Sequence, residues 1–369
     1  MSRRPGYVTT GPYAPPVPRT TLTAVSADGA RLYAEIHGPE DAPAVVLAHG
    51  WTCSTAFWAP VVRDLAADHK VVVYDQRGHG RSPAAGPAGH STPALADDLV
   101  AVLEATLRPD ERAVVGGHSM GGMTIMAAAE RPQLRERAAA ALLCSTGSAD
   151  LPAESRVFPL RSPQGRRRAH RVMLRSRAPL GPVSPLTKRA LKYATMGPGA
   201  TAEQIEACAR IVHACPSGVR ARWGKVLAGL ELTGGVGRLE LPTAVIAGTA
   251  DRLTPIVHAR RLASVLPDCL GLTELPGLGH MTPIEDPGAV AGLLRALVKD
   301  HLRSPGTGTD ADAGPDAGPA TGTDAGPATG TDAGPATDAE AGPATDAEAG
   351  EAAAPEVPRS TRQKKEKTV

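Results

Sequence analysis

The run Gly117-His118-Ser119-Met120-Gly121 sets one serine between two glycines, where an apolar run gives way to a helical one. Ala113 to Val115 predicts a strand buried on both faces, and Met120 to Glu130 predicts a buried helix that Pro132 ends. Small neighbours allow a sharp reversal at Ser119, which lifts its hydroxyl to the N-terminal end of the helix. The arrangement suits a nucleophile, and a serine that only caps the following helix is the alternative.

A serine nucleophile needs a base, an acid to orient that base, and donors for an oxyanion. His280 follows the last predicted strand in a glycine-flanked loop, and Asp251 follows another strand end. Their order along the chain, Ser119 then Asp251 then His280, is the order that the serine turn requires. We expect the backbone N–H groups of Trp51 and Met120 to hold the oxyanion.

Ser119, Asp251 and His280 can meet only if the ends of their strands lie side by side. The sequence indeed alternates predicted strands with predicted helices. The predicted strands are 20–25, 31–37, 44–48, 70–74, 113–115, 139–144, 241–247 and 270–275. This alternation predicts an α/β fold with a mostly parallel eight-stranded sheet and helices on both faces. The loops after parallel strands gather at one edge, where the three side chains would meet.

The alternation stops between Asp150 and Arg238, where helical patches separated by Pro and Gly predict a helical cap over the sheet. The core would then comprise residues 20–149 and 239–302. Residues 1–19, rich in Pro and Gly, predict a disordered arm. Residues 303–369 repeat Thr, Gly, Asp, Ala and Pro and end in a basic cluster; lacking aliphatic side chains to bury, they predict a disordered tail.

Composition excludes several classes of protein. The net charge is +2 over 369 residues, and no nucleic-acid-binding signature is present. We find no uncharged apolar stretch of about 18 residues and no apolar signal segment, so we expect neither a membrane span nor secretion. Five cysteines without CxxC or metal-ligand spacing predict free thiols, no metal site and a cytoplasmic location. The oligomeric state stays open.

Five segments in order resemble the α/β-hydrolase fold superfamily, and the resemblance covers residues 20–302. They are His49-Gly50-Trp51, Asp75-Gln76-Arg77-Gly78-His79-Gly80-Arg81-Ser82, Gly117-His118-Ser119-Met120-Gly121-Gly122, Gly248-Thr249-Ala250-Asp251-Arg252-Leu253-Thr254-Pro255 and Gly277-Leu278-Gly279-His280. The resemblance, to capped serine esterases and lipases and to cofactor-free haloperoxidases, implies nucleophile Ser119, acid Asp251, base His280 and no cofactor. Some members carry the acid after the sixth strand, which makes Asp150 the alternative. Epoxide hydrolases and haloalkane dehalogenases of this fold use an aspartate nucleophile, so Ser119 argues against both activities.

The expected function is hydrolysis of a small-molecule carboxylic ester with a small or medium apolar acyl group, through an acyl-enzyme. Phe57, Trp58, Met123 and Met281 are expected to line the acyl pocket beside Trp51 and Met120, with packing in the core as the alternative for several of them. The alternatives are perhydrolysis (haloperoxidase activity), thioester cleavage, acyl transfer, and ligand binding without catalysis.

Other residues near these motifs are expected to be structural. His118 should point to the opposite face from Ser119 and pack in the core. Loop-ordering roles are expected for His49, Asp75, Arg77 and Ser82, and Cys53 should be inert. The cap arginines predict a solvated face, with attraction of anionic lipid or an acidic substrate as the alternative; they are Arg156, Arg161, Arg166, Arg167, Arg168, Arg171, Arg175 and Arg177.

Overall fold

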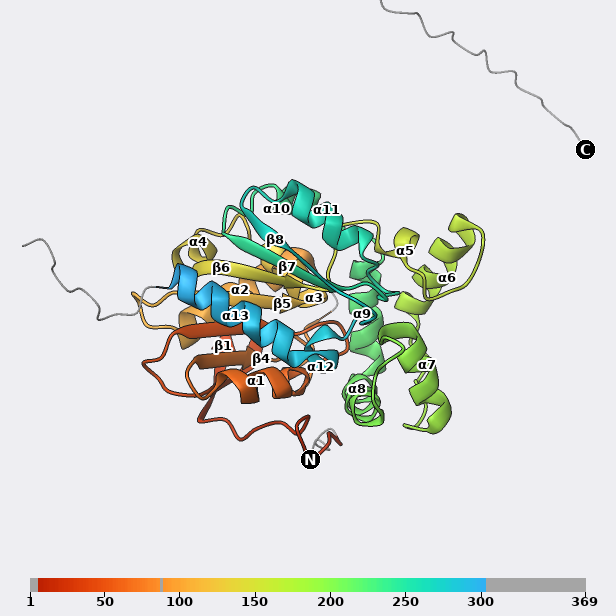
Figure 1. Ribbon diagram of the computed structural model, residues 1–369, viewed down its shortest axis with the longest axis horizontal. Helices are drawn as coiled ribbons and strands as arrows, with labels where there is room; N and C mark the ends of the chain where they lie inside the picture. Colours follow the sequence, from red (N-terminus) through yellow and green to blue (C-terminus); the bar gives the residue numbers. More distant parts are fainter. Residues whose placement is uncertain (1–5, 87–88, 303–369) are drawn as a thin grey trace, which may run out of the picture. The chain divides into compact units, whose positions relative to one another are not determined.

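The computed structural model describes residues 6–86 and 89–302, within which eight strands form one sheet (Figure 1). Its order is β1-β2-β4-β3-β5-β6-β7-β8. β1 and β2 pair antiparallel, β2 pairs antiparallel with β4, and the remaining pairs are parallel. The mostly parallel α/β sheet is therefore confirmed. The strands are β1 Thr20–Val25, β2 Arg31–His37, β3 Ala44–Ala48, β4 Lys70–Tyr74, β5 Ala113–His118, β6 Ala138–Cys144, β7 Thr243–Gly248 and β8 Cys269–Leu275.

The central strands are buried on both faces because their alternating side chains enter two separate hydrophobic clusters. On β3, Val45 and Leu47 pack with α1 (Ala59–Leu65) and α13 (Pro287–His301). Val46 enters the cluster on the other face, to which α2 (Thr92–Thr106), α3 (Met120–Ala127) and α11 (Val257–Val265) also contribute side chains. Each fully buried Val or Leu side chain adds about 2 kcal/mol of stabilisation. Helices on both faces thus fix the strand ends that carry the site.

Helix boundaries differ from the sequence prediction mainly around Pro132. α3 ends at Ala127, and Pro132 begins a new helix, α4 (Pro132–Arg137), instead of ending the earlier one. Proline is tolerated there because the first turn of a helix needs no N–H donor. The prediction also missed short elements that span too few residues to show a helical period: α5 Leu151–Glu154, α10 Thr233–Val236 and α12 Thr282–Glu285. The 3₁₀ helix η1 (Thr55–Trp58) immediately precedes α1.

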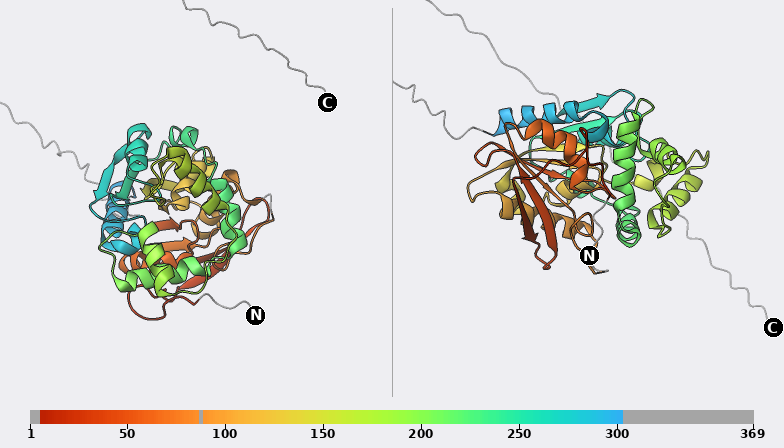
Figure 2. Two further views of the ribbon diagram at one scale, coloured as in Figure 1. Left: turned by 90° about the vertical axis from the view of Figure 1, so that its right-hand side faces the viewer. Right: turned by 90° about the horizontal axis from the view of Figure 1, so that it is seen from below.

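A group of helices, α5 to α9, lies beyond the carboxyl ends of the parallel strands, and we call it the cap (Figures 1 and 2). α6 and α7 are its outermost helices in Figure 1. Serine or threonine side chains cap the N-termini of three of its helices, which explains why these helices begin where they do. Beyond α5, the cap consists of α6 Pro163–Arg175, α7 Pro185–Thr195, α8 Ala202–Ala214 and α9 Ser217–Leu227.

Residues 6–19, which the sequence predicts to be disordered, form no helix or strand but are held against the folded core. Ala14 is buried, and its carbonyl oxygen accepts a hydrogen bond from Arg63 at 2.9 Å. The carbonyl oxygen of Gly6 accepts one from Arg210 of α8. The predicted tail, 303–369, lies outside the described residues. In the part of the chain that the structure describes, no helix is long and apolar enough to cross a membrane.

Candidate active site

Ser119 occupies a strained turn between β5 and α3. Its φ is +51° and its ψ is −114°, a combination that a non-glycine residue adopts at a cost of about 1–3 kcal/mol. The flanking glycines make the turn feasible: a Cβ on Gly117 would approach Gly121 within 2.4 Å, and one on Gly121 would lie 2.0 Å from the Ala48 carbonyl oxygen. The glycine spacing therefore has a steric cause, and the turn presents Ser119 at the first residues of α3.

His280 and Asp251 meet across the loops that follow β8 and β7. His280 Nδ1 lies 2.7 Å from Asp251 Oδ2, and both side chains are buried. Thr254 Oγ1 donates to the same Asp251 oxygen at 2.8 Å and lies 3.1 Å from His280 Nδ1. The other Asp251 oxygen accepts the backbone N–H groups of Leu253 and Thr254. These bonds hold the Asp251 carboxylate in place, and its contact with Nδ1 orients the imidazole of His280.

Glu285 holds the loop that carries His280. Its carboxylate accepts backbone N–H groups from Gly197 at 2.7 Å and from Gly279 and Met281 at 3.1 Å each. The His280 N–H itself donates to Thr195 O of α7 at 2.8 Å. Burial raises the pKa of Glu285, against the lowering effect of these donors. The loop that carries His280 is thereby joined to the end of the cap helix α7.

The side chain of His118 contacts the backbone of His280. Its Nε2 lies 2.8 Å from His280 O, and a carbonyl can only accept, so Nε2 carries the proton. Burial holds the pKa of His118 well below its usual value, which keeps the ring neutral. The packing role expected of His118 agrees with these contacts, but the expected opposite orientation is wrong. Both His118 and Ser119 line one cavity, because the turn at Ser119 breaks the strand alternation.

The expected oxyanion donors, the backbone N–H groups of Trp51 and Met120, donate to no acceptor within the described residues. Trp51 follows a loop that His49 orders: His49 Nδ1 donates to Gly50 O at 2.7 Å, and Nε2 accepts the Gln76 N–H at 3.0 Å. Burial keeps the pKa of His49 well below its usual value. The loop-ordering role predicted for His49 is confirmed, and the neutral ring fixes the backbone beside the oxyanion position.

The loop after β4 is tied together by buried polar groups, as predicted for Asp75, Arg77 and Ser82. Asp75 accepts two backbone N–H groups, one of them from Arg81 at 2.8 Å, and burial raises its pKa to about 7. Arg77 donates to Asp98 at 2.6 Å, and Ser82 donates to Asp75 O at 2.6 Å. These contacts are internal to the loops and their supports, so none of the three side chains is free for catalysis.

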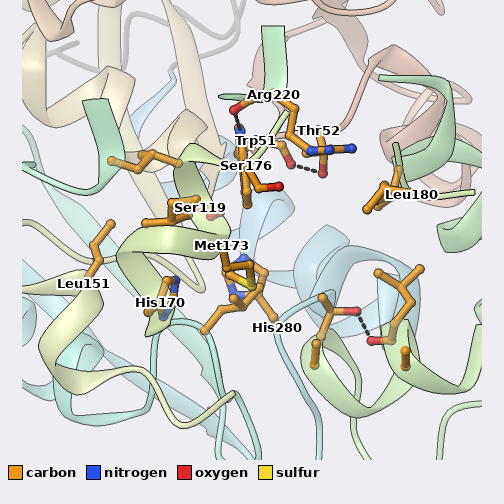
Figure 3. Close-up of a pocket in the computed structure, with 18 of the residues that line it drawn as sticks. Trp51, Thr52, Ser119, Leu151, His170, Met173, Ser176, Leu180, Arg220 and His280 are labelled. Atoms are coloured by element: carbon orange, nitrogen blue, oxygen red, sulfur yellow. Dashed lines mark hydrogen bonds between the residues drawn. The ribbon is translucent and has the colours of Figure 1, made fainter. Parts of the chain in front are cut away.

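The side chains of Ser119 and His280 line a cavity of about 750 Å³ beneath the cap (Figure 3). The described residues include no hydrogen bond between them. The volume falls in the range of small-molecule sites, roughly 300–1,000 Å³. Apolar side chains dominate the wall: Trp51, Met123, Leu151, Phe158, Val172, Met173, Leu174, Leu180, Leu191, Val212, Leu227, Leu253 and Met281.

Three of the predicted pocket residues, Trp51, Met123 and Met281, therefore lie in the cavity wall. Met120, Phe57 and Trp58 do not; they are fully buried in the core, where the Phe57 ring packs 4.5 Å from that of His118. Phe57 and Trp58 both belong to the 3₁₀ helix η1, which directly precedes α1, and their side chains join the hydrophobic cluster on that face of the sheet. The prediction for these two aromatic residues is wrong.

Asp150, the alternative acid, makes no contact with His280 in the described residues. Its side chain is half exposed and pairs with Arg167 of α6 at 3.4 Å. Cys53 is buried and lies away from any activating group, and burial raises the pKa of its thiol. The geometry thus favours Asp251 over Asp150 and leaves Cys53 without a role.

Sequence reasoning missed Thr254 and Glu285. Thr254 lies three residues after Asp251, a spacing that lets its hydroxyl turn back onto the carboxylate. Glu285 is the last residue of α12, the short helix that follows His280, but its bond to Gly197 spans 88 residues and no sequence pattern near either residue predicts it.

Comparison with known proteins shows the family to which the chain belongs. The family model described as "Alpha/beta hydrolase family" matches residues 45–293. The chain belongs to the α/β-hydrolase family. The α/β-hydrolase fold and the hydrolase class are thereby established. The resemblance found in the sequence motifs is confirmed.

Relatives of the chain carry several names. It is 33% identical over 258 residues to a protein of Variovorax paradoxus (strain S110) named carbamate hydrolase RutD, covering 68% of this chain and 89% of the relative. It is 25% identical over 280 residues to the bifunctional esterase/perhydrolase DCH of Acinetobacter calcoaceticus, covering 74% and 97%. The crystal structure of the enol-lactonase from Burkholderia xenovorans LB400 matches with a TM-score of 0.60 at 25% identity, covering 75% and 100%.

Proposed function

We propose that the protein hydrolyses carboxylic esters with an apolar acyl group, using Ser119 as nucleophile, His280 as base and Asp251 as the orienting acid. The observation that carries the proposal is the 2.7 Å contact between Asp251 Oδ2 and Nδ1 of His280, a residue that lines the same apolar cavity as Ser119. None of the proposed steps requires a cofactor.

In the first half-reaction, His280 Nε2 takes the proton of Ser119 Oγ as Oγ forms a bond to the ester carbonyl carbon. The carbonyl π electrons move to its oxygen, which the N–H groups of Trp51 and Met120 stabilise. Collapse of this intermediate breaks the bond to the alcohol oxygen, and His280 Nε2–H protonates the leaving alcohol. The acyl group remains on Ser119.

Water completes the cycle. His280 Nε2 removes a proton from water, whose oxygen bonds to the acyl carbonyl carbon, and the second oxyanion occupies the same two N–H groups. Breaking the bond to Oγ returns the proton from His280 to Ser119 and releases the carboxylic acid. Asp251 stays ionised throughout, because Thr254 and two backbone N–H groups donate to it.

The cavity supports a small or medium apolar acyl group. Its wall consists mostly of aliphatic side chains and methionines, which reward burial of an alkyl chain by about 0.8 kcal/mol per CH₂. The surrounding cap closes over the site and limits the length of a bound chain. A polymeric substrate would need an open groove.

A second candidate reaction is hydrolysis of a carbamate, because the relative from Variovorax paradoxus bears that name. The same serine would attack a carbonyl that carries nitrogen on one side. The apolar wall favours the ester, since an N–H of the carbamate would find few acceptors there.

We also propose a reducing compartment such as the cytoplasm. All five cysteines are free thiols, and four of them are buried.

Hydrolysis of p-nitrophenyl esters of graded acyl length, alongside a p-nitrophenyl carbamate, tests the proposal. We expect ester turnover to rise with chain length until the cavity is filled, and Ser119→Ala to lower kcat on the order of a millionfold. Faster turnover of the carbamate would favour the second reaction. Full ester turnover by Ser119→Ala would exclude Ser119 as nucleophile.

A further inference from the structure

The outer part of the cap carries a high positive charge. Between Ser155 and Ala202 the chain contains no Asp or Glu, although it holds eleven basic residues. They are Arg156, Arg161, Arg166, Arg167, Arg168, Arg171, Arg175, Arg177, Lys188, Arg189 and Lys192. A segment of this composition creates a local positive field far larger than the net charge of the chain suggests.

α6 concentrates this charge on one face. Arg168, Arg171 and Arg175 recur at helical spacing with Val172 between them, and all four side chains are exposed. They line a shallow groove. Within residues 6–86 and 89–302, no carboxylate lies within 4.0 Å of these three guanidinium groups. The opposite face of α6 carries the buried Leu174, so the helix is amphipathic with its charged face outward.

Aliphatic side chains are exposed among these charges. Leu186 of α7 is 77% exposed and Val172 of α6 is 65% exposed, and Leu160, Leu180 and Val183 also reach solvent. Exposed aliphatic side chains interspersed with unpaired arginines are typical of a surface that meets anionic lipid. A nucleic acid would gain nothing from the aliphatic groups.

This face adjoins the mouth of the active-site cavity. Val172 and Ser176 line both the groove on α6 and the cavity, and the exposed Leu180 also lines the cavity. Figure 2 (left) looks onto this side of the molecule, where α6 and α7 lie toward the viewer. A binding partner that covers Arg168, Arg171 and Arg175 therefore also lies against the entrance of the active-site cavity.

We propose that the α6–α7 face is a docking surface for an anionic lipid bilayer. The arginines contact lipid phosphates, and the exposed aliphatic side chains enter the headgroup region. Docking brings apolar molecules dissolved in the bilayer to the entrance of the cavity without a passage through water.

Co-sedimentation of the full chain with vesicles tests this proposal without any use of turnover, so its result is independent of the proposed ester hydrolysis. One vesicle set is pure phosphatidylcholine, and the other is an equal mixture of phosphatidylcholine and phosphatidylglycerol. We expect binding to the mixed vesicles alone, weakened by added salt. Each basic residue near such a surface contributes about fivefold in affinity.

The decisive variant reverses the three arginines: Arg168→Glu, Arg171→Glu and Arg175→Glu together. We expect it to lose binding to the mixed vesicles on the order of a hundredfold, while its melting temperature by circular dichroism stays near that of the parent. The matched control makes the same charge change on the core, with Arg31→Glu, Arg135→Glu and Lys299→Glu, and should lose far less. Because all proteins keep the same C-terminal segment, its basic residues cannot explain a difference between the variants.

Three results would overturn the proposal. These are no binding to either vesicle set, equal binding to the neutral and anionic sets, and an equal loss in the α6 and control variants. If the α6 variant unfolds, the single changes Arg171→Gln and Leu186→Ser replace it. Unchanged binding by both would overturn the proposal equally.

Discussion

The surroundings of His280 and the outer part of the cap meet at the cavity, and they differ in how their polar groups are paired. Around His280 the polar atoms are buried and bonded to one another: Asp251 accepts Thr254 and two backbone N–H groups, and Glu285 accepts three. The outer cap exposes its charge instead, and Arg171 has no acidic partner in the described chain. Buried, mutually satisfied polar groups hold one geometry, whereas exposed charge is available for a partner.

This difference suggests a division of roles, in which the strand-end loops carry out the reaction and the cap selects the substrate. Reaction type depends on atoms fixed within fractions of an ångström, which the strand-end loops provide. In the proposed reaction, substrate choice depends on the apolar side chains with which the cap lines the cavity. Substitutions in the first region should therefore abolish turnover, and substitutions in the second should redirect it.

Among the substitutions that test this comparison, Asp251→Asn has the largest expected effect. The amide cannot stabilise the imidazolium and can reverse the His280 tautomer, so kcat should fall about 10⁴-fold with little change in KM. Asp150→Asn is the matched control and should retain full ester turnover, because Asp150 faces Arg167 at the surface. The reverse pattern in a steady-state assay would reassign the acid.

Acid should destabilise the buried core of the site. His79 accepts the Thr52 N–H, and burial lowers its pKa from 6.5 to about 4. His79 therefore takes up a proton at a higher pH in the unfolded chain than in the folded chain. Its contribution to the free energy of unfolding is constant above pH 6.5 and falls as the pH drops toward 4. His79 alone should remove about 3 kcal/mol over that range, at about 1.4 kcal/mol per unit.

Urea unfolding at a series of pH values measures this loss. His79→Gln keeps an acceptor for the Thr52 N–H but cannot titrate, and we expect a shallower fall below pH 6.5. An identical slope in the variant would show that His79 does not supply the acid sensitivity.

Glu285→Gln tests the link between the His280 loop and the cap. Its amide opposes at least one of the N–H groups of Gly197, Gly279 and Met281, so the loop should shift by a fraction of an ångström. We expect kcat to fall roughly 10- to 100-fold, with a smaller change in KM. Glu104→Gln on the exposed face of α2 is the control. Equal turnover in both variants would mean that Glu285 does not position His280.

A smaller and more selective effect is expected from Met173→Ala in the cap. The enlarged cavity should raise kcat/KM for longer acyl chains relative to the acetate by about tenfold, since each methylene contributes about 1–3 kcal/mol of discrimination. Leu186→Ala changes an exposed cap residue that does not line the cavity and should leave the preference unchanged. A uniform loss across all chain lengths in Met173→Ala would contradict the separation of chemistry from selection.

Much of the site was predictable because its signals are local. Continuous apolar runs mark the parallel strands, and small residues after β5, β7 and β8 mark the loops that carry Ser119, Asp251 and His280. Parallel strands bring such loops to one edge, so the meeting of Asp251 with His280 follows from topology.

Other features depend on contacts between distant segments. The bond between Glu285 and Gly197 requires the cap to fold back onto the His280 loop, and no pattern near either residue reports it. Composition suggested that Phe57 and Trp58 belong near the pocket, but the orientation of η1 buries both in the core. Four-residue helices such as α12 are too short for their periodicity to be recognised.

The central claim is that Ser119 is activated by His280 and Asp251. Labelling the full chain with a fluorophosphonate and locating the adduct by mass spectrometry tests it most directly. The account predicts a phosphonylated Ser119, with labelling lost in Ser119→Ala and strongly slowed in Asp251→Asn. An unlabelled protein, or an adduct on another residue that persists in Ser119→Ala, would contradict it.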